Sequence, residues 1–129
     1  MDLASQAQGD RRRIVVIGPC AAGKTSLTTR LKRLGFDARA CGQEHSEIAE
    51  LWKHLEPDVL VGLQIHLDTL RRRRSATWPG SIYERQLSRL ASGFSHADLV
   101  IDCDEIDQEA VVEEVLTWLE SHPDAGHAG

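Results

Sequence analysis

The residues best suited to chemistry stand together near the start of the chain, in the segment Gly18-Pro19-Cys20-Ala21-Ala22-Gly23-Lys24-Thr25. Its spacing is G-x-x-x-x-G-K-[ST], with a β-branched run before it and an amphipathic stretch after it. Glycines let the backbone turn its N–H groups towards an anion at close range. The pattern therefore predicts a loop that binds the phosphates of a nucleoside triphosphate, with a chance glycine-rich turn as the alternative.

Two side chains of this loop have expected roles in chemistry. Lys24 would reach the β- and γ-phosphates, and the Thr25 hydroxyl would ligate a Mg²⁺ ion that bridges the same oxygens. No N-K-x-D segment for reading guanine occurs in the chain, so ATP is the expected nucleotide. The expected nucleotide-binding residues are Gly18, Pro19, Cys20, Ala21, Ala22, Gly23, Lys24, Thr25 and Ser26.

An acidic residue is also needed near the metal ion, and Glu44 in Gln43-Glu44-His45-Ser46 is the best candidate. It follows a short strand candidate, and parallel α/β sheets bind ligands beyond the carboxyl ends of their strands. Glu44 could hold a Mg²⁺-bound water or take the proton of an attacking hydroxyl. The alternative is a solvated helix start with Ser46 as its cap.

Arg71 to Arg74 are four consecutive arginines that close a predicted helix before a Pro/Gly loop. An arginine at that place would neutralise charge on a transferring phosphoryl group. Successive helical residues point about 100° apart, so not all four can face one phosphate. We expect one or two of them to do so, Arg71 or Arg74 above all, with Arg85 and Arg89 contributing from the next helix. The alternative is a basic helix end that is favoured by the helix dipole.

The surrounding sequence alternates strand and helix patterns, which is typical of a three-layer α/β/α fold with a parallel sheet of four strands, or of five. Strands are expected at 14–17, 36–41, 59–65 and 99–103. Helices are expected at 25–34, 46–55, 66–74 and 81–94, with a last helix capped by Asp107. Right-handed crossovers predict the spatial order 36–41, 14–17, 59–65, 99–103. We expect a disordered leader at 1–12, one domain at 13–120 and a flexible tail at 121–129.

Composition excludes several classes of protein. The 129 residues carry a net charge of −5 and only 5% aromatic residues, which argues against a nucleic-acid partner. Three cysteines without CxxC spacing and scattered histidines predict neither a disulfide framework nor a metal site of their own. No run is long enough to span a bilayer, so we expect a cytoplasmic protein without a membrane partner. The oligomeric state cannot be read from the sequence.

Two further stretches extend the pattern. Pro57-Asp58-Val59-Leu60-Val61-Gly62-Leu63, running on to Leu70 and the arginines, resembles the strand and lid of thymidylate-kinase-like enzymes. Ala97-Asp98-Leu99-Val100-Ile101-Asp102 is similar to the last strand of shikimate-kinase-like enzymes. The chain thus resembles small kinases of the P-loop NTPase superfamily.

This resemblance implies an ATP-dependent phosphotransferase that acts on a small-molecule acceptor, with the base near Asp102 to Glu105. Lys24, Glu44, Arg71 and Arg74 would be the catalytic residues, and Thr25 and Glu44 the metal ligands. The chain departs from these kinases because one strand and the usual acceptor-binding insertion are missing after the first helix. Gln64 stands where they often have an Asp, so Asp68 is the reserve acid. The alternative functions are a nucleotide-binding regulatory module with slow or no hydrolysis and a domain that only binds phosphate.

Overall fold

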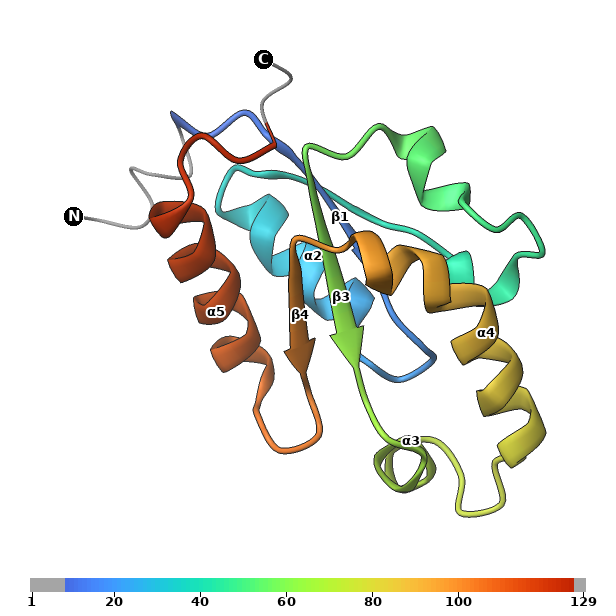
Figure 1. The fold of residues 1–129 in the computed structure, drawn as a ribbon. Coiled ribbons are helices and arrows are strands. Elements are labelled where there is room, and N and C mark those ends of the chain that lie inside the picture. Colours follow the sequence, from blue (N-terminus) through green and yellow to red (C-terminus); the bar gives the residue numbers. More distant parts are fainter. Residues whose placement is uncertain (1–8, 127–129) are drawn as a thin grey trace.

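The computed structural model describes residues 9–126 (Figure 1). The expected leader therefore lies mostly outside the described residues, and so do the last three residues of the expected tail. None of the helices in the described part is long and apolar enough to cross a membrane.

A four-stranded parallel sheet forms the centre of the molecule. In spatial order its strands are β2 (Asp37–Ala40), β1 (Arg13–Ile17), β3 (Val59–Gln64) and β4 (Leu99–Asp102). Ile14 pairs with Ala38 on one side and with Val59 on the other. The predicted strands, their parallel direction and their order are confirmed, and each strand lies within a residue or two of its expected bounds.

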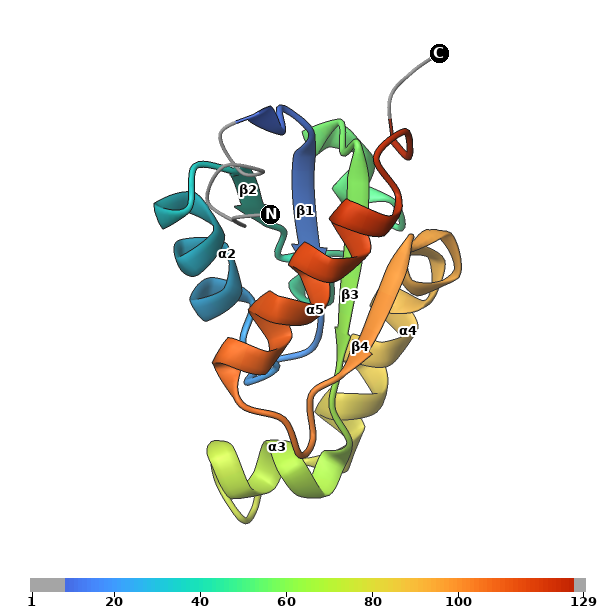
Figure 2. The same ribbon diagram turned by 90° about the vertical axis from the view of Figure 1, so that its left-hand side faces the viewer.

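Helices cover both faces of the sheet, which confirms the three-layer architecture (Figure 2). The helices α2 (Lys24–Arg33) and α5 (Gln108–Ser121) lie on one face, and α4 (Gly80–His96) lies on the other. Successive residues of β1 alternate between the two cores. Ile14 and Val16 belong to the core under α2 and α5, whereas Val15 and Ile17 pack with Trp52 and Leu90.

The expected helix at 46–55 is wrong. The structure has two short 3-10 helices there, η1 (Gln43–His45) and η2 (Leu51–Leu55), with turns between them. The fully buried Gln43 side chain donates to the Ile48 carbonyl and accepts from the Trp52 amide, so it takes backbone groups that a helix would pair internally. Trp52 is buried as part of the core, but Ile48 is 55% exposed rather than on a buried stripe.

The remaining helices follow their sequence signals. α3 (Leu67–Arg73) comes directly after β3, and a short loop leads from it into α4. Asp107 caps α5, since its carboxylate accepts the Ala110 amide at 2.8 Å. The first turn of α4 is held against the end of β3, because the Tyr83 hydroxyl donates to the Ile65 carbonyl at 2.8 Å.

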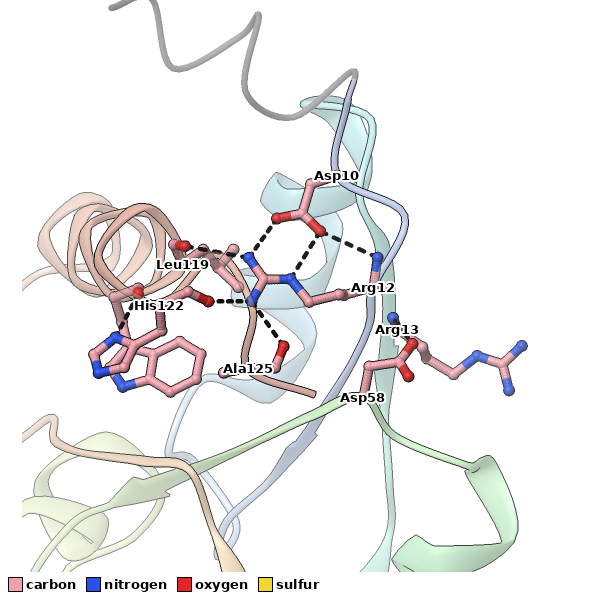
Figure 3. Close-up of polar contacts among 8 residues, drawn as sticks. Asp10, Arg12, Arg13, Asp58, Leu119, His122 and Ala125 are labelled. Atoms are coloured by element: carbon pink, nitrogen blue, oxygen red, sulfur yellow. Dashed lines mark hydrogen bonds and ion pairs between the residues drawn. The ribbon is translucent and has the colours of Figure 1, made fainter. Parts of the chain in front are cut away.

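Arg12 joins the two ends of the described chain (Figure 3). Its guanidinium donates to the carbonyls of Leu119, His122 and Ala125 at 3.2, 2.6 and 3.0 Å. The same group pairs with Asp10 at 2.8 Å, and Arg12 is only 3% exposed. We call this group of contacts the terminal clamp. It brings residues assigned to the leader against residues assigned to the tail.

Candidate functional site

The predicted phosphate loop lies between the end of β1 at Ile17 and the start of α2 at Lys24, at the carboxyl edge of a central strand. Gly18 is required there, because a Cβ atom would stand 2.6 Å from the Leu63 carbonyl oxygen. Gly23, the N-cap of α2, has a φ of 101°, in the region that favours glycine. Ala21 also has a positive φ of 65°. The loop therefore wraps tightly around the helix start, where backbone N–H groups attract anions.

The Lys24 ammonium lies inside this loop. It donates to the Gly18 and Pro19 carbonyls at 2.7 and 3.3 Å, and to Glu44 Oε2 at 2.5 Å. The ammonium thus has three acceptors, two of them on the loop itself.

Glu44 is brought to the loop by η1, which follows β2 beside β1. The residue is 3% exposed, so the alternative of a solvated helix start does not hold for it. Its second oxygen, Oε1, is buried without a hydrogen-bond partner among residues 9–126. A buried carboxylate with one unsatisfied oxygen is costly, which points to a ligand for that oxygen.

Helix α4 holds η1 in place through Arg89. The Arg89 guanidinium donates to the Glu44 carbonyl at 3.2 Å and also pairs with the Glu47 carboxylate. The bond from Arg89 lowers the pKa of Glu47 below its ordinary value. Arg89 was expected to face phosphate, but here it supports the segment that carries Glu44.

Helix α4 also holds the phosphate loop, through a residue that sequence reasoning missed. Gln86 is 3% exposed; its Oε1 accepts the Cys20 amide at 3.0 Å, and its Nε2 donates to the Cys20 sulfur at 3.2 Å. Its position three residues after Tyr83 and four before Leu90 puts a polar side chain on the buried stripe of the helix. This polar residue on an otherwise apolar helix face could have identified Gln86 from the sequence, since a buried side-chain amide needs hydrogen-bond partners.

A cavity of about 300 Å³ opens beside the loop. Its lining residues are Cys20, Ala21, Gly23, Lys24, Thr25, Ser26, Glu44, His45 and Arg74. The cavity brings together three site residues that were predicted from the sequence, Lys24, Thr25 and Glu44. Arg74, one of the two arginines that were expected to face a phosphate, also lines it. Asp68, the reserve acid, is exposed on α3 and does not line this cavity.

The arginines of α3 divide into different roles. Arg74 lines the cavity, whereas Arg71 donates to the Trp78 carbonyl at 3.0 Å and braces the loop between α3 and α4. Arg73, the neighbour for which no contact with the site was expected, donates to the Ala21 carbonyl in the predicted phosphate loop and to the Cys103 carbonyl, both at 2.8 Å. Arg73 thus ties the end of α3 to that loop.

A second cavity of about 280 Å³ lies on the other side of the loop. Gly23 and Arg73 contribute to its wall, together with Cys103 after β4 and the segment 106–108 that leads into α5. It overlaps only partly with the region after β4, Asp102 to Glu105, where the base was expected.

A separate polar cluster joins the ends of β3 and β4. The Asp104 carboxylate accepts the His66 amide at 2.9 Å and pairs with the His66 ring, and Asp102 lies beside both. Burial raises the pKa of Asp104, but hydrogen bonds from His66 and Thr69 outweigh it and bring this pKa to about 2. The same bond raises the pKa of His66. The scattered histidines of the sequence thus include one with close acidic neighbours.

The strand order, the loop at the end of β1 and the arginine-bearing helix after β3 together form a kinase-like α/β fold. Among solved structures, the chain is similar to the crystal structure of shikimate kinase from Bacteroides thetaiotaomicron, with a TM-score of 0.58 and 17% sequence identity. The match covers 84% of this chain and 98% of that chain. No protein-family model and no curated protein sequence matches the chain. At this identity the likeness establishes the fold, and it confirms the resemblance to shikimate-kinase-like proteins at that level.

Proposed function

We propose that the protein is an ATP- and Mg²⁺-dependent phosphotransferase that acts on a small-molecule acceptor. The observation that carries the proposal is the buried Glu44 carboxylate, held 2.5 Å from Lys24 beside a phosphate loop. Replacing a buried ion pair by apolar residues often leaves a protein equally stable or more stable. A carboxylate and a lysine kept at this place are therefore better explained by charge handling than by stability.

The residues present fit a magnesium ion. Mg²⁺ takes oxygen ligands, and the cavity offers the Thr25 hydroxyl and the Glu44 carboxylate, one oxygen of which has no partner in the described chain. When bound, Mg²⁺ would neutralise negative charge on the β- and γ-phosphates. Thr25 and Glu44 are the residues that would hold it.

Three side chains of the protein, those of Lys24, Arg74 and Glu44, would have separate roles in the transfer. Lys24 would turn from Glu44 to the phosphate oxygens while it keeps the Gly18 carbonyl as an anchor. Arg74 would neutralise charge on the transferring group from across the cavity. Glu44, once released by Lys24, would either order a Mg²⁺-bound water or accept the proton of the attacking hydroxyl, and the neighbouring His45 would orient the acceptor.

The second cavity is our candidate for the base. It opens next to the loop and has apolar walls at Ile106 and Val111, with polar groups at Asp107 and Gln108. Such a mixture suits a planar base. Because the chain has no N-K-x-D segment for reading guanine, we propose that ATP is preferred over GTP, and competition between the two nucleotides tests that preference.

The test of nucleotide binding is the variant Lys24→Ala, titrated with Mg-ATP in a calorimeter. Binding should be lost or severely weakened, while circular dichroism shows an intact fold. Lys32→Ala is the matched control, because Lys32 is exposed on the same helix and should bind as the wild type does. Unchanged affinity in Lys24→Ala would rule out the assignment of Lys24.

A second candidate function is a nucleotide-binding regulatory module. The observation in its favour is the short connection between Arg33 and Asp37, which leaves no acceptor-binding insertion between α2 and β2. The two functions differ in ADP production. Mg-ATP binding with no ADP formed across a panel of hydroxyl acceptors would favour the module, and acceptor-dependent ADP release would favour the enzyme.

A further inference from the structure

Three side chains with metal-ligand chemistry meet at the wall of the loop cavity, and nucleotide binding does not use all of them. They are Cys20 from the phosphate loop and the consecutive residues Glu44 and His45 from η1. One ligand atom from each lies within 4.8 Å of the other two. A thiol, an imidazole and a carboxylate together suit Zn²⁺ far better than Mg²⁺, which prefers oxygen ligands.

The spacing of the ligand atoms matches a tetrahedral ion. Cys20 Sγ lies 3.7 Å from His45 Nε2, and His45 Nε2 lies 3.7 Å from Glu44 Oε2. Zn–S bonds of about 2.3 Å and Zn–N bonds of about 2.0 Å at tetrahedral angles separate ligand atoms by about 3.5 Å. Small side-chain shifts therefore suffice to enclose the ion, and the open cavity leaves a fourth position for water.

Independent features point to a ligand at this place. The Glu44 side chain is 96% buried, and its Oε1 has no hydrogen-bond partner among the described residues. Gln86 donates to the Cys20 sulfur at 3.2 Å, the kind of outer contact that orients a metal ligand. Lys24 can release Glu44 because it keeps two carbonyl acceptors. The charges of a thiolate and a carboxylate would balance Zn²⁺.

We propose that Cys20, Glu44 and His45 form a binding site for Zn²⁺, and that zinc and a triphosphate exclude each other there. Zinc would take the carboxylate assigned to magnesium and fill the cavity next to Lys24 and Thr25. Only the exclusion rests on the proposed function. Zinc binding itself is measured without nucleotide, so its failure is distinguishable from a failure of ATP binding.

The binding test titrates the full chain with Zn²⁺ against a chromogenic chelator, with excess Mg²⁺ present. Cys20→Ser and His45→Gln should each weaken zinc binding by about 100-fold or more. His66→Gln is the matched control and should bind as the wild type does, because His66 lies in the other acidic cluster. Co²⁺ should give a thiolate charge-transfer band that is lost in Cys20→Ser. Zinc should also protect Cys20 from alkylation, since the other two cysteines are buried.

The possible results separate clearly. Absence of zinc binding, displacement by Mg²⁺, or wild-type affinity in both Cys20→Ser and His45→Gln would overturn the site. Loss of binding in His66→Gln alone would also overturn it and assign zinc to the His66 cluster. His45 is 64% exposed, so His45→Gln remains informative even if Cys20→Ser fails to fold. For the exclusion, Mg-ATP and Zn²⁺ must weaken each other by the same factor; independent binding would overturn it.

Discussion

At the scale of single residues, the contact between Lys24 and Glu44 shows how the charge of the loop lysine is held. The carboxylate and the two loop carbonyls together satisfy the three donors of the ammonium. In the proposed function, a triphosphate oxygen would replace the carboxylate on Lys24. The same residue pair would thus couple phosphate binding to release of Glu44.

Our first prediction concerns Glu44→Gln, which removes the charge and nearly keeps the shape. We expect turnover to fall by about 10²-fold or more while Mg-ATP affinity stays close to the wild-type value. Steady-state ADP release and calorimetry measure the two quantities. Glu50→Gln is the control, because Glu50 pairs with the nearby Lys53 outside the cavity. If Glu44→Gln keeps full turnover, the role passes to Asp68. If Asp68→Asn keeps full turnover as well, the protein is not a kinase.

At the scale of elements, α4 is the helix that positions both halves of the site. Gln86 bonds the phosphate loop, and Arg89 bonds η1. One turn further on, Gly93 lies against the sheet, where an added Cβ atom would stand 2.3 Å from Ile17 and 3.4 Å from Trp52. The close approach of α4 to the end of β1 is therefore a condition for bringing Cys20 and Glu44 together.

Our second prediction follows from this packing. Gly93→Ala should lower the free energy of unfolding by about 1–2 kcal/mol. The methyl group would overlap Cδ1 of the fully buried Ile17, and such overpacking costs about 1–3 kcal/mol, of which the better helix propensity of Ala returns up to about 1 kcal/mol. Gly80→Ala on the same helix is the matched control, since its Cβ would meet ordinary contacts at 3.7 Å or more. Urea unfolding of both variants measures the difference. A stability loss in Gly80→Ala equal to that in Gly93→Ala would show that the helix does not pack as described.

Our third prediction concerns the His66–Asp104 pair, which joins the ends of β3 and β4. The pKa of Asp104 is lowered from 3.8 to about 2, so its contribution to stability is present above pH 3.8 and is lost as the pH falls through 2. The pKa of His66 is raised from 6.5, so its contribution is complete below pH 6.5 and is lost as the pH rises through the raised value. Both contributions are therefore complete between pH 3.8 and 6.5.

The variant Asp104→Asn tests the pair directly. It should return the His66 pKa towards its ordinary value, as measured by an NMR titration of the ring protons. It should also remove the loss of stability that this pair causes below pH 3.8 and above pH 6.5. The His96 ring, which lies at the end of α4 and away from Asp104, serves as the internal control. A His66 pKa that does not change between wild type and variant would contradict the pairing.

At the scale of the whole molecule, the terminal clamp closes the domain. Arg12 stands directly before β1 and holds the carbonyls of Leu119, His122 and Ala125 (Figure 3). Leu119 belongs to the last turns of α5, and His122 and Ala125 belong to the segment that follows it. The clamp thus fixes the carboxyl end of the helix whose first turn lines the cavity proposed for the base.

Our fourth prediction is that Arg12→Ala lowers the free energy of unfolding by about 3–5 kcal/mol, the range seen when one partner of a buried ion pair is removed. Arg39→Ala is the matched control. Arg39 pairs with Asp37, but its side chain is 47% exposed, so its loss should change stability by about 1 kcal/mol or less. Denaturant unfolding measures both. Equal small losses in the two variants would mean that the ends contribute little to the fold.

Much of this protein was determined by local sequence. Strand and helix patterns are set by the periodicity of apolar residues over a few positions, and the rule of right-handed crossovers then orders the strands. The loop spacing from Gly18 to Thr25 likewise placed the site at the end of β1. The helix expected at 46–55 failed because one buried side chain, Gln43, took the backbone groups of that segment.

Only the tertiary structure decided which side chains meet. The burial of Glu44 depends on Arg89 from α4, and the phosphate loop is braced by Gln86 and by Arg73 rather than Arg71. These partners are separated by 45 to 66 residues along the chain. Their contacts follow from how closely helices pack on the sheet, and no local periodicity encodes such distances, because packing depends on the shapes of all the side chains between two elements.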